Sequence, residues 1–428
     1  MNAPIPPLPA APPAAAPATP RPAGPEGEGP RLLVVSTQPW TMAARLAGAL
    51  AQAGCVVEAA SPPHALLARS GAPRAHHRLH PWRLRRDLAT ALRRARPDRV
   101  LPADDAAAAL LATLRPEPDL AALVEASLGA PESTAVAHSK TAQMALAARL
   151  GLPVPETRPV ESLPALLAAL AESGLPRVLK ADGSWGGTGV TLLREAAAAP
   201  AAYAAATTRP SLLQTAKLAA WEGSLRPFAA RRAWRRPALH LQAFIAGPPA
   251  NRAVLAERGR VLAGLSVEVL TTLSPTGPGS VVRVIDHPQM AATAAAMAAR
   301  LGLSGLLGFD FVLEAGTGRA LLLEMNPRAT PICHLSDAPG GGLAGALAAH
   351  LAGRDPAAVP LPAPGTTIAL FPSEWLRDPA SPWLREARHD VPWHDAPLLR
   401  AYMEDAAALR RFERRRAWLR RLLGRPPC

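Results

Sequence analysis

Short apolar runs alternate with stretches of helical periodicity between residues 31 and 102. The runs that predict buried strands are Arg31–Ser36, Cys55–Ala59 and Arg99–Pro102. Two stretches, about 41–53 and 83–95, repeat their apolar positions with a helical period. Strands that alternate with helices pair in parallel through βαβ units, so this region is predicted to be a small Rossmann-like domain. Its first strand is followed by Ser-Thr-Gln-Pro-Trp at 36–40 rather than by a G-x-G-x-x-G fingerprint, so no dinucleotide is assigned.

A second group of elements surrounds a glycine-rich segment. A helix is predicted from Lys140 to Leu150, and Gly151 and Pro153 close it and open an extended connector. The run Arg177–Lys180 predicts a strand, and after Ala181 and Asp182 residues 183–190 read Gly-Ser-Trp-Gly-Gly-Thr-Gly-Val. Such small residues would let backbone N–H groups approach a phosphate, although taken alone the segment is more often an ordinary glycine turn.

Two further apolar runs predict a β-hairpin that carries hard oxygen ligands. The predicted strands are Gly308–Val312 and Leu321–Leu323, joined by the turn 315–318. Because side chains alternate along a strand, Glu324 and Asn326 would project to one side, and the hairpin would bring Asp310 beside them. Carboxylate and amide oxygens suit Mg²⁺. Single acidic residues on an edge strand commonly face solvent, but that reading does not explain the Asn-Pro-Arg sequence that follows Met325.

The chain beyond residue 360 predicts a strand, an extended segment and a final helix. They cover Thr367–Phe371, Asp390–Trp393 and residues 403–423. Apolar residues of the helix form a stripe at helical spacing, namely Leu409, Phe412, Leu419 and Leu423. Arginines cover its other faces, so the helix could lie on an anionic membrane or bind an acidic partner. We favour docking of the stripe on the protein's own core, because Arg416 interrupts it.

Composition narrows the class of protein. The 428 residues, 49% of them hydrophobic, suffice for a large core and two or three domains. Residues 1–30 are rich in Pro and Ala without a basic start, which excludes a secretory signal and predicts a disordered tail. No apolar stretch approaches the ~20 residues of a membrane span, so a soluble protein is expected. The scattered Cys55, Cys333 and Cys428 support neither disulfides nor a cysteine-rich metal site, and predict a reducing, cytoplasmic compartment.

Almost all of the many basic residues are arginine. The net charge of +14 invites nucleic-acid binding. However, the excess lies in Arg-rich stretches without an aromatic-basic RNA motif or zinc module, so nucleic acid is not expected as a partner. Only Lys140, Lys180 and Lys217 are lysines among 47 basic residues. A compact ammonium suits a phosphate in a crowded site better than a planar guanidinium does, so a retained lysine suggests such a site.

Taken in order, these motifs resemble those of ATP-grasp enzymes of the carboxylate-amine ligase and biotin-carboxylase type. The matching strings are Lys140 with 151–157, Val178–Lys180 with 186–190, Gly308–Val312, and Leu323–Arg328. The resemblance covers roughly residues 31–350. It implies an α/β and α+β architecture, in which a Rossmann-like pre-ATP-grasp domain precedes a two-lobed ATP-grasp domain. The implied boundaries are 1–30 for the tail, 31–125 and 126–360 for the two domains, about 176–245 for the lid lobe, and 361–428 for a C-terminal extension.

The resemblance also implies roles for individual residues. Those expected to bind ATP are Lys140, Lys180, Gly186, Gly187 and Gly189 at the phosphates, and Gln242, Phe244 and Ile245 at the adenine hinge. Those expected to hold Mg²⁺ or Mn²⁺ are Asp310, Glu324 and Asn326. Arg328 and Lys180 would act at the transferred phosphoryl group, although in so Arg-rich a chain Arg328 is also compatible with a plain surface ion pair.

The implied activity is that of an ATP- and Mg²⁺-dependent ligase. A carboxylate would be phosphorylated to an acyl phosphate, and an amine or other nucleophile would displace phosphate, leaving ADP and phosphate. A non-catalytic nucleotide sensor or scaffold is the alternative. The expected partners are the two small-molecule substrates, with no membrane, and oligomeric state is left open. Neither substrate follows from the sequence, and no role is assigned to Trp185, Lys217, Cys333 or His334.

Overall fold

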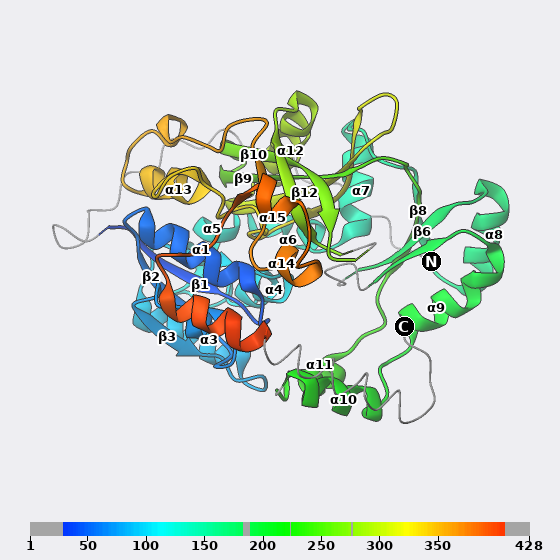
Figure 1. The fold of residues 1–428 in the computed structure, drawn as a ribbon. Helices are drawn as coiled ribbons and strands as arrows, with labels where there is room; N and C mark the ends of the chain where they lie inside the picture. Colours follow the sequence, from blue (N-terminus) through cyan, green and yellow to red (C-terminus); the bar gives the residue numbers. More distant parts are fainter. Residues whose placement is uncertain (1–28, 183–188, 223, 275–276, 407–428) are drawn as a thin grey trace.

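The computed structural model describes residues 29–182, 189–222, 224–274 and 277–406 (Figure 1). The predicted tail therefore lies almost wholly outside the described residues, as do Trp185, Gly186, Gly187 and the apolar stripe between 409 and 423. The described chain forms three sheets, and each contains strands that the apolar pattern predicted.

The first sheet has four strands in the order β3-β2-β1-β4, and all of its pairings are parallel. Its strands are β1 (Arg31–Val35), β2 (Val56–Ser61), β3 (Ala75–Arg78) and β4 (Arg99–Pro102). The helices of this part are α1 (Thr41–Gln52), α2 (Leu66–Arg69), α3 (Leu84–Ala95), α4 (Asp105–Ala112) and α5 (Ala121–Leu128). The predicted Rossmann-like arrangement is confirmed. The polar Ala-His-His-Arg sequence of β3 hid this edge strand from a hydrophobic pattern.

The second sheet has seven strands in the order β13-β12-β9-β10-β11-β14-β15 and is antiparallel except where β14 pairs with β15. Its strands are β9 (Pro249–Glu257), β10 (Arg260–Thr272), β11 (Gly279–Ile285), β12 (Gly305–Leu313), β13 (Ala320–Asn326), β14 (Thr367–Ala369) and β15 (Arg388–His389). The predicted hairpin is present as β12 and β13. Because β14 pairs with β11, the chain after residue 360 contributes two strands to this sheet.

The third sheet has the order β5-β8-β6-β7 and lies to one side of the second (Figure 1). Its strands are β5 (Thr157–Val160), β6 (Arg177–Ala181), β7 (Val190–Leu193) and β8 (Leu239–Ala243). Its helices are α8 (Leu163–Ser173), α9 (Ala199–Thr207), α10 (Leu212–Glu222) and α11 (Arg226–Ala233). Since β5 belongs to it, this sheet begins upstream of residue 176, where the lid lobe was expected to start.

Two hydrophobic cores cover opposite faces of the seven-stranded sheet. One packs α1 and α13 (Gly342–Leu351) against the face that carries Leu255 and Val267. The other packs α7 (Lys140–Arg149) and α12 (Pro288–Leu301) against the face that carries Phe309 and Phe311. Because side chains alternate along β12, Asp310 points to the first face. Short helices complete the chain, namely α6 (Thr134–Ala137), α14 (Ser373–Arg377) and α15 (Trp383–Glu386).

The last described helix covers residues 396–406 and begins before residue 403, the predicted start. The Asp395 carboxylate accepts a hydrogen bond from the backbone N–H of Leu398 and caps the helix. Leu398 and Tyr402 belong to a buried cluster with residues of α1 and α2 (red segment in Figure 1). The described part of the C-terminal helix therefore docks on the protein's own core. None of the helices in the described ranges is long and apolar enough to cross a lipid bilayer.

Candidate active site

A cleft of about 640 Å³ is lined by residues of both the third and the seven-stranded sheets. Its lining includes the selected residues Lys140, Lys180, Gln242, Phe244, Ile245, Asp310, Glu324, Asn326 and Arg328. Gly189, just before β7, is not part of the lining, and Gly186 and Gly187 lie outside the described residues. The fold thus gathers nine of the selected residues, from distant parts of the sequence, around one cleft.

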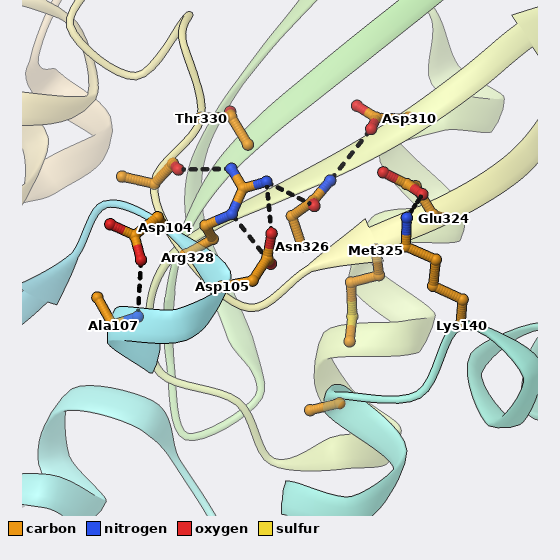
Figure 2. Close-up of polar contacts among 12 residues, drawn as sticks. Asp104, Asp105, Ala107, Lys140, Asp310, Glu324, Met325, Asn326, Arg328 and Thr330 are labelled. Atoms are coloured by element: carbon orange, nitrogen blue, oxygen red, sulfur yellow. Dashed lines mark hydrogen bonds and ion pairs between the residues drawn. The ribbon is translucent and has the colours of Figure 1, made fainter. Parts of the chain in front are cut away.

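The predicted metal ligands meet because β12 and β13 pair with Asp310 opposite Glu324 and Gly308 opposite Asn326. The Asn326 side-chain amide donates a hydrogen bond to Asp310 Oδ2 over 3.1 Å (Figure 2). Asn251 lies opposite Asp310 on β9 and donates to its Oδ1 over 2.6 Å. Asn251 was not among the residues predicted for the site, because no motif surrounds it and only the pairing of β9 with β12 places it here.

The two selected lysines lie near the carboxylates, but only one of them forms an ion pair there. Lys140 begins α7, and its Nζ lies 2.7 Å from Glu324 Oε2 (Figure 2). Lys180 on β6 is 6% exposed, and its ammonium makes no ion pair with any described residue. Burial lowers the pKa of Lys180 and Lys140 lowers it further, while Glu324 and Asp310 oppose the shift. A buried ammonium of this kind is costly until an anion reaches it, which fits a phosphate-binding role.

Asp310 and Glu324 differ in their tendency to ionise. Burial and the neighbouring Glu324 charge raise the pKa of Asp310 to about 7. Burial also opposes ionisation of Glu324, but the Lys140 and Lys180 ammonium groups outweigh burial and lower the pKa of Glu324 to about 2. Two adjacent carboxylates repel each other when both are charged, and a divalent cation between them would remove that cost.

The donor set fits Mg²⁺. Across the described ranges, no group of three or more His, Cys, Asp or Glu side chains could hold a metal ion. Asp310, Glu324 and the amide oxygen of Asn326 instead provide three hard oxygen ligands. Mg²⁺ usually takes only one or two protein carboxylates and completes its shell with water and substrate phosphates. These residues therefore suit an ion that arrives with a nucleotide.

Arg328 is held beside the carboxylates by the first residue of α4 and by the residue just before α1. Its Nε and Nη2 each lie 3.0 Å from one oxygen of Asp105, and Nη2 also donates to Asn326 Oδ1 over 3.0 Å (Figure 2). Its guanidinium carbon lies 5.7 Å from the centre of the Trp40 ring. Neither Asp105 nor Trp40 was among the residues predicted for the site. Their place just after β4 and β1 was the available signal, because ligands of α/β sheets bind beyond the carboxyl ends of the strands.

The end of the cleft beside the third sheet is largely apolar. Gln242 on β8 is 1% exposed, and its Nε2 donates to Thr157 Oγ1 over 3.2 Å. Phe244 and Ile245 follow the last residue of β8 and contribute to the wall with Val178. Apolar walls with a few fixed polar groups are typical of small-molecule and cofactor sites.

Three residues that had no assigned role, Lys217, Cys333 and His334, do not line the cleft. Cys333 Sγ accepts a hydrogen bond from the Thr330 backbone N–H over 3.2 Å, and burial raises the pKa of its thiol. His334 Nε2 lies 2.7 Å from Asp390 Oδ2 in the interior. Lys217 lies on α10, outside the lining. Cys333 and His334 therefore belong to the core rather than to the site.

A scan of protein-family models finds no match, and a search of the curated proteins finds no significant one. Solved structures are similar in fold. The biotin carboxylase domain of Hydrogenobacter thermophilus 2-oxoglutarate carboxylase has a TM-score of 0.51 at 14% identity over 71% of this chain. Biotin carboxylase from Campylobacter jejuni has a TM-score of 0.50 at 15% identity over 70% of this chain. The chain spans 65% and 66% of these two structures.

A third structure covers more of the chain. N5-carboxyaminoimidazole synthase from Aspergillus clavatus has a TM-score of 0.53 at 16% identity, over 79% of each chain. These neighbours are ATP-grasp ligases. At such low identity the similarity concerns the fold alone, and it confirms the architecture expected from the motifs. The chain has the ATP-grasp fold.

Proposed function

We propose that this protein is an ATP- and Mg²⁺-dependent ligase that activates a carboxylate as an acyl phosphate for attack by an amine or another nucleophile. The observation that carries the proposal is the meeting of Lys140, Lys180, Asp310, Glu324 and Arg328 around one cleft of an ATP-grasp fold. The Hydrogenobacter structure contains MgADP and bicarbonate, and the Aspergillus structure contains ADP and an amino-imidazole ribonucleotide. We also propose residues 31–125 as the pre-ATP-grasp domain and 126–360 as the ATP-grasp domain.

The charges of the cleft suit a bound triphosphate. Lys180 makes no close ion pair among the described residues, and Lys140 can exchange the Glu324 carboxylate for a phosphate oxygen. Mg²⁺, when bound, would neutralise the phosphate oxygens and the carboxylates of Asp310 and Glu324 together. Phosphoryl transfer depends mainly on such positioning and charge stabilisation, so no further acid or base is required at the phosphorus.

The reaction has two steps. In the first, a carboxylate oxygen attacks the γ-phosphorus, the bond to the bridging oxygen breaks, and ADP leaves with that electron pair. Arg328 lies beside the carboxylates and would hold the substrate carboxylate and then the acyl phosphate. In the second step, the nucleophile attacks the acyl carbon, the carbon–oxygen bond to phosphate breaks, and phosphate departs. The proton of an attacking amine passes to phosphate or water.

A sensor without turnover would need the nucleotide contacts but not an arginine fixed beside the metal ligands. Arg328 is held there by Asp105, Asn326 and the Trp40 ring. This arrangement favours an enzyme over a sensor.

Glu324→Gln tests the proposal. The change keeps the shape of the side chain and removes the charge that would bind Mg²⁺, so ADP release with pooled carboxylates and amines should be abolished while circular dichroism stays unchanged. The matched control is Glu268→Gln on β10. The Glu268 carboxylate lies 2.7 Å from Arg283 Nη2, and Glu268 is not part of the cleft lining. This control should keep wild-type ADP release. Full activity of Glu324→Gln would refute the proposal.

A further inference from the structure

Beyond Arg328 the cleft continues into an apolar compartment. Its walls are Trp40, Val269, Val282, Ile332 and Leu370. Val269 on β10 pairs with Val282 on β11, and Leu370 follows β14, so the compartment lies over the half of the seven-stranded sheet away from β13. All four aliphatic residues belong to the core beneath the first sheet's helices. Their side chains are therefore held in place before any ligand arrives.

The pairing of the strands explains why polarity changes at this point. Glu324, Asp310 and Asn251 lie side by side on β13, β12 and β9, and the next residue in that row is Val267 on β10. Val269 lies two residues further along β10 and so points to the same face. The row thus passes from carboxylates through an amide to valines, and the polar part of the site ends at β9.

None of the charged side chains described in the cleft lies beyond the point where the polar part of the cleft ends. They are Lys140, Lys180, Asp310, Glu324 and Arg328. Around the apolar compartment, the polar side-chain groups of the described lining are all uncharged, namely the hydroxyls of Thr271, Thr272 and Thr330 and the indole N–H of Trp40. A second charged group on a substrate would therefore lose its hydration there without gaining a partner, which is unfavourable. Hydrocarbon would gain instead from burial against the aliphatic walls.

We propose that the carboxylate bound and activated at this site carries an uncharged apolar substituent. Arg328, fixed by Asp105 and flanked by the Trp40 ring, holds the carboxylate at the boundary, and the substituent occupies the apolar compartment. The activation step rests on the proposed ligase function, but the binding preference does not. A dicarboxylate or a phosphorylated acid fits the compartment poorly, because its second anion would face valine, isoleucine and leucine.

Binding can be measured separately from turnover. The probes are pentanoate and glutarate, which have the same carbon chain and differ by one terminal carboxylate. With the full-length protein saturated with MgADP, the nucleotide end is filled, and isothermal titration should show pentanoate binding at least about tenfold more tightly than glutarate, since pocket contacts of this size change discrimination about 10–200-fold. Equal or tighter binding of glutarate, or no binding of pentanoate, would overturn the proposal.

A charge placed in the compartment should reverse the preference. Thr272 ends β10, is partly exposed and lines the compartment, so Thr272→Arg should be accommodated and should favour glutarate over pentanoate. Thr90→Arg, the same change on the exposed face of α3, is the matched control and should leave the preference as in the wild type. Should Thr272→Arg not fold, Ile332→Ala enlarges the compartment and should shift the preference from pentanoate toward heptanoate. An unchanged preference in the folded variant would place the substituent elsewhere and overturn the proposal.

An ADP-release assay with hydroxylamine as nucleophile, and with pentanoate, glutarate or bicarbonate as the carboxylate, separates the binding proposal from the ligase proposal. If pentanoate binds preferentially but no ADP forms, the ligase function fails and the binding preference stands. If ADP forms only with bicarbonate or dicarboxylates, the ligase function stands and the apolar-substituent proposal fails.

Discussion

The buried His240 predicts a loss of stability in mild acid that one substitution should remove. His240 lies on β8 directly opposite Lys180 on β6 and is fully buried. Burial lowers the pKa of His240 to about 3, the positive charges of Lys180 and Lys140 add to this shift, and Glu324 opposes it. The folded protein therefore keeps His240 neutral at pH values where the unfolded chain binds a proton.

The magnitude follows from the two pKa values. The ordinary histidine pKa is 6.5, and each unit of difference between the states is worth about 1.36 kcal/mol. A pH of 5.0 lies about 1.5 units below that value. Protonation of the histidine in the unfolded chain should therefore remove about 2 kcal/mol from the free energy of unfolding. The contribution is complete above pH 6.5 and is lost progressively as the pH falls toward about 3.

Urea unfolding of the wild type and of His240→Gln at pH 7.5 and pH 5.0 tests this expectation. Glutamine can still hydrogen-bond to Thr141 Oγ1, which lies 3.2 Å from His240 Nδ1, but it cannot take up a proton. Between the two pH values the wild type should lose about 2 kcal/mol more than the variant. His389→Gln, at an exposed position on β15, should lose as much as the wild type.

Carbon-13 NMR of labelled histidine gives an independent readout, and His240 should remain neutral at pH 5.0. The nearest acid is Asp182, whose Oδ1 lies 3.7 Å from His240 Nδ1. If this carboxylate compensated for burial, His240 would titrate near pH 6.5. That titration, or equal acid sensitivity of wild type and His240→Gln, would refute the reasoning.

Three further predictions concern the site and the C-terminal helix. Lys180→Arg should lower kcat/KM about a hundredfold or more, because a planar guanidinium cannot replace a buried ammonium, whereas Lys217→Arg on α10 should be silent in the same ADP-release assay. Asp105→Asn should lower kcat/KM about tenfold with unchanged nucleotide affinity, because Arg328 loses the charge of the carboxylate that orients its guanidinium; equal loss of nucleotide affinity would contradict this role. Compared with the full chain, a chain ended after residue 395 should have a free energy of unfolding lower by about 3 kcal/mol or more, measured by thermal unfolding. A chain ended after residue 406 keeps the described helix contacts, so its free energy of unfolding should fall by less.

Local features of the sequence were sufficient to predict the hairpin that carries Asp310, Glu324 and Asn326. The turn at 315–318 joins two strands that are adjacent in sequence, so their pairing follows from the pattern, and the alternation of side chains then places Asp310 near Glu324 and Asn326. The helix start at 396 was locally encoded as well. Asp395 followed by Pro397 in the first turn is a common N-terminal signal, and the expected helix start at residue 403 did not take it into account.

Only the tertiary structure decided what surrounds that hairpin. Asn251 reaches Asp310 because β9 pairs with β12, and Asp105 reaches Arg328 because α4 begins beside β13 in space. Periodicity shows which face of a strand is buried, but it does not show which distant strand lies beside it or in which register. The sequence therefore determined the residue types that can bind phosphate and metal. The order of the seven-stranded sheet decided the rest, because it sets carboxylates on one half of the cleft and the apolar compartment on the other.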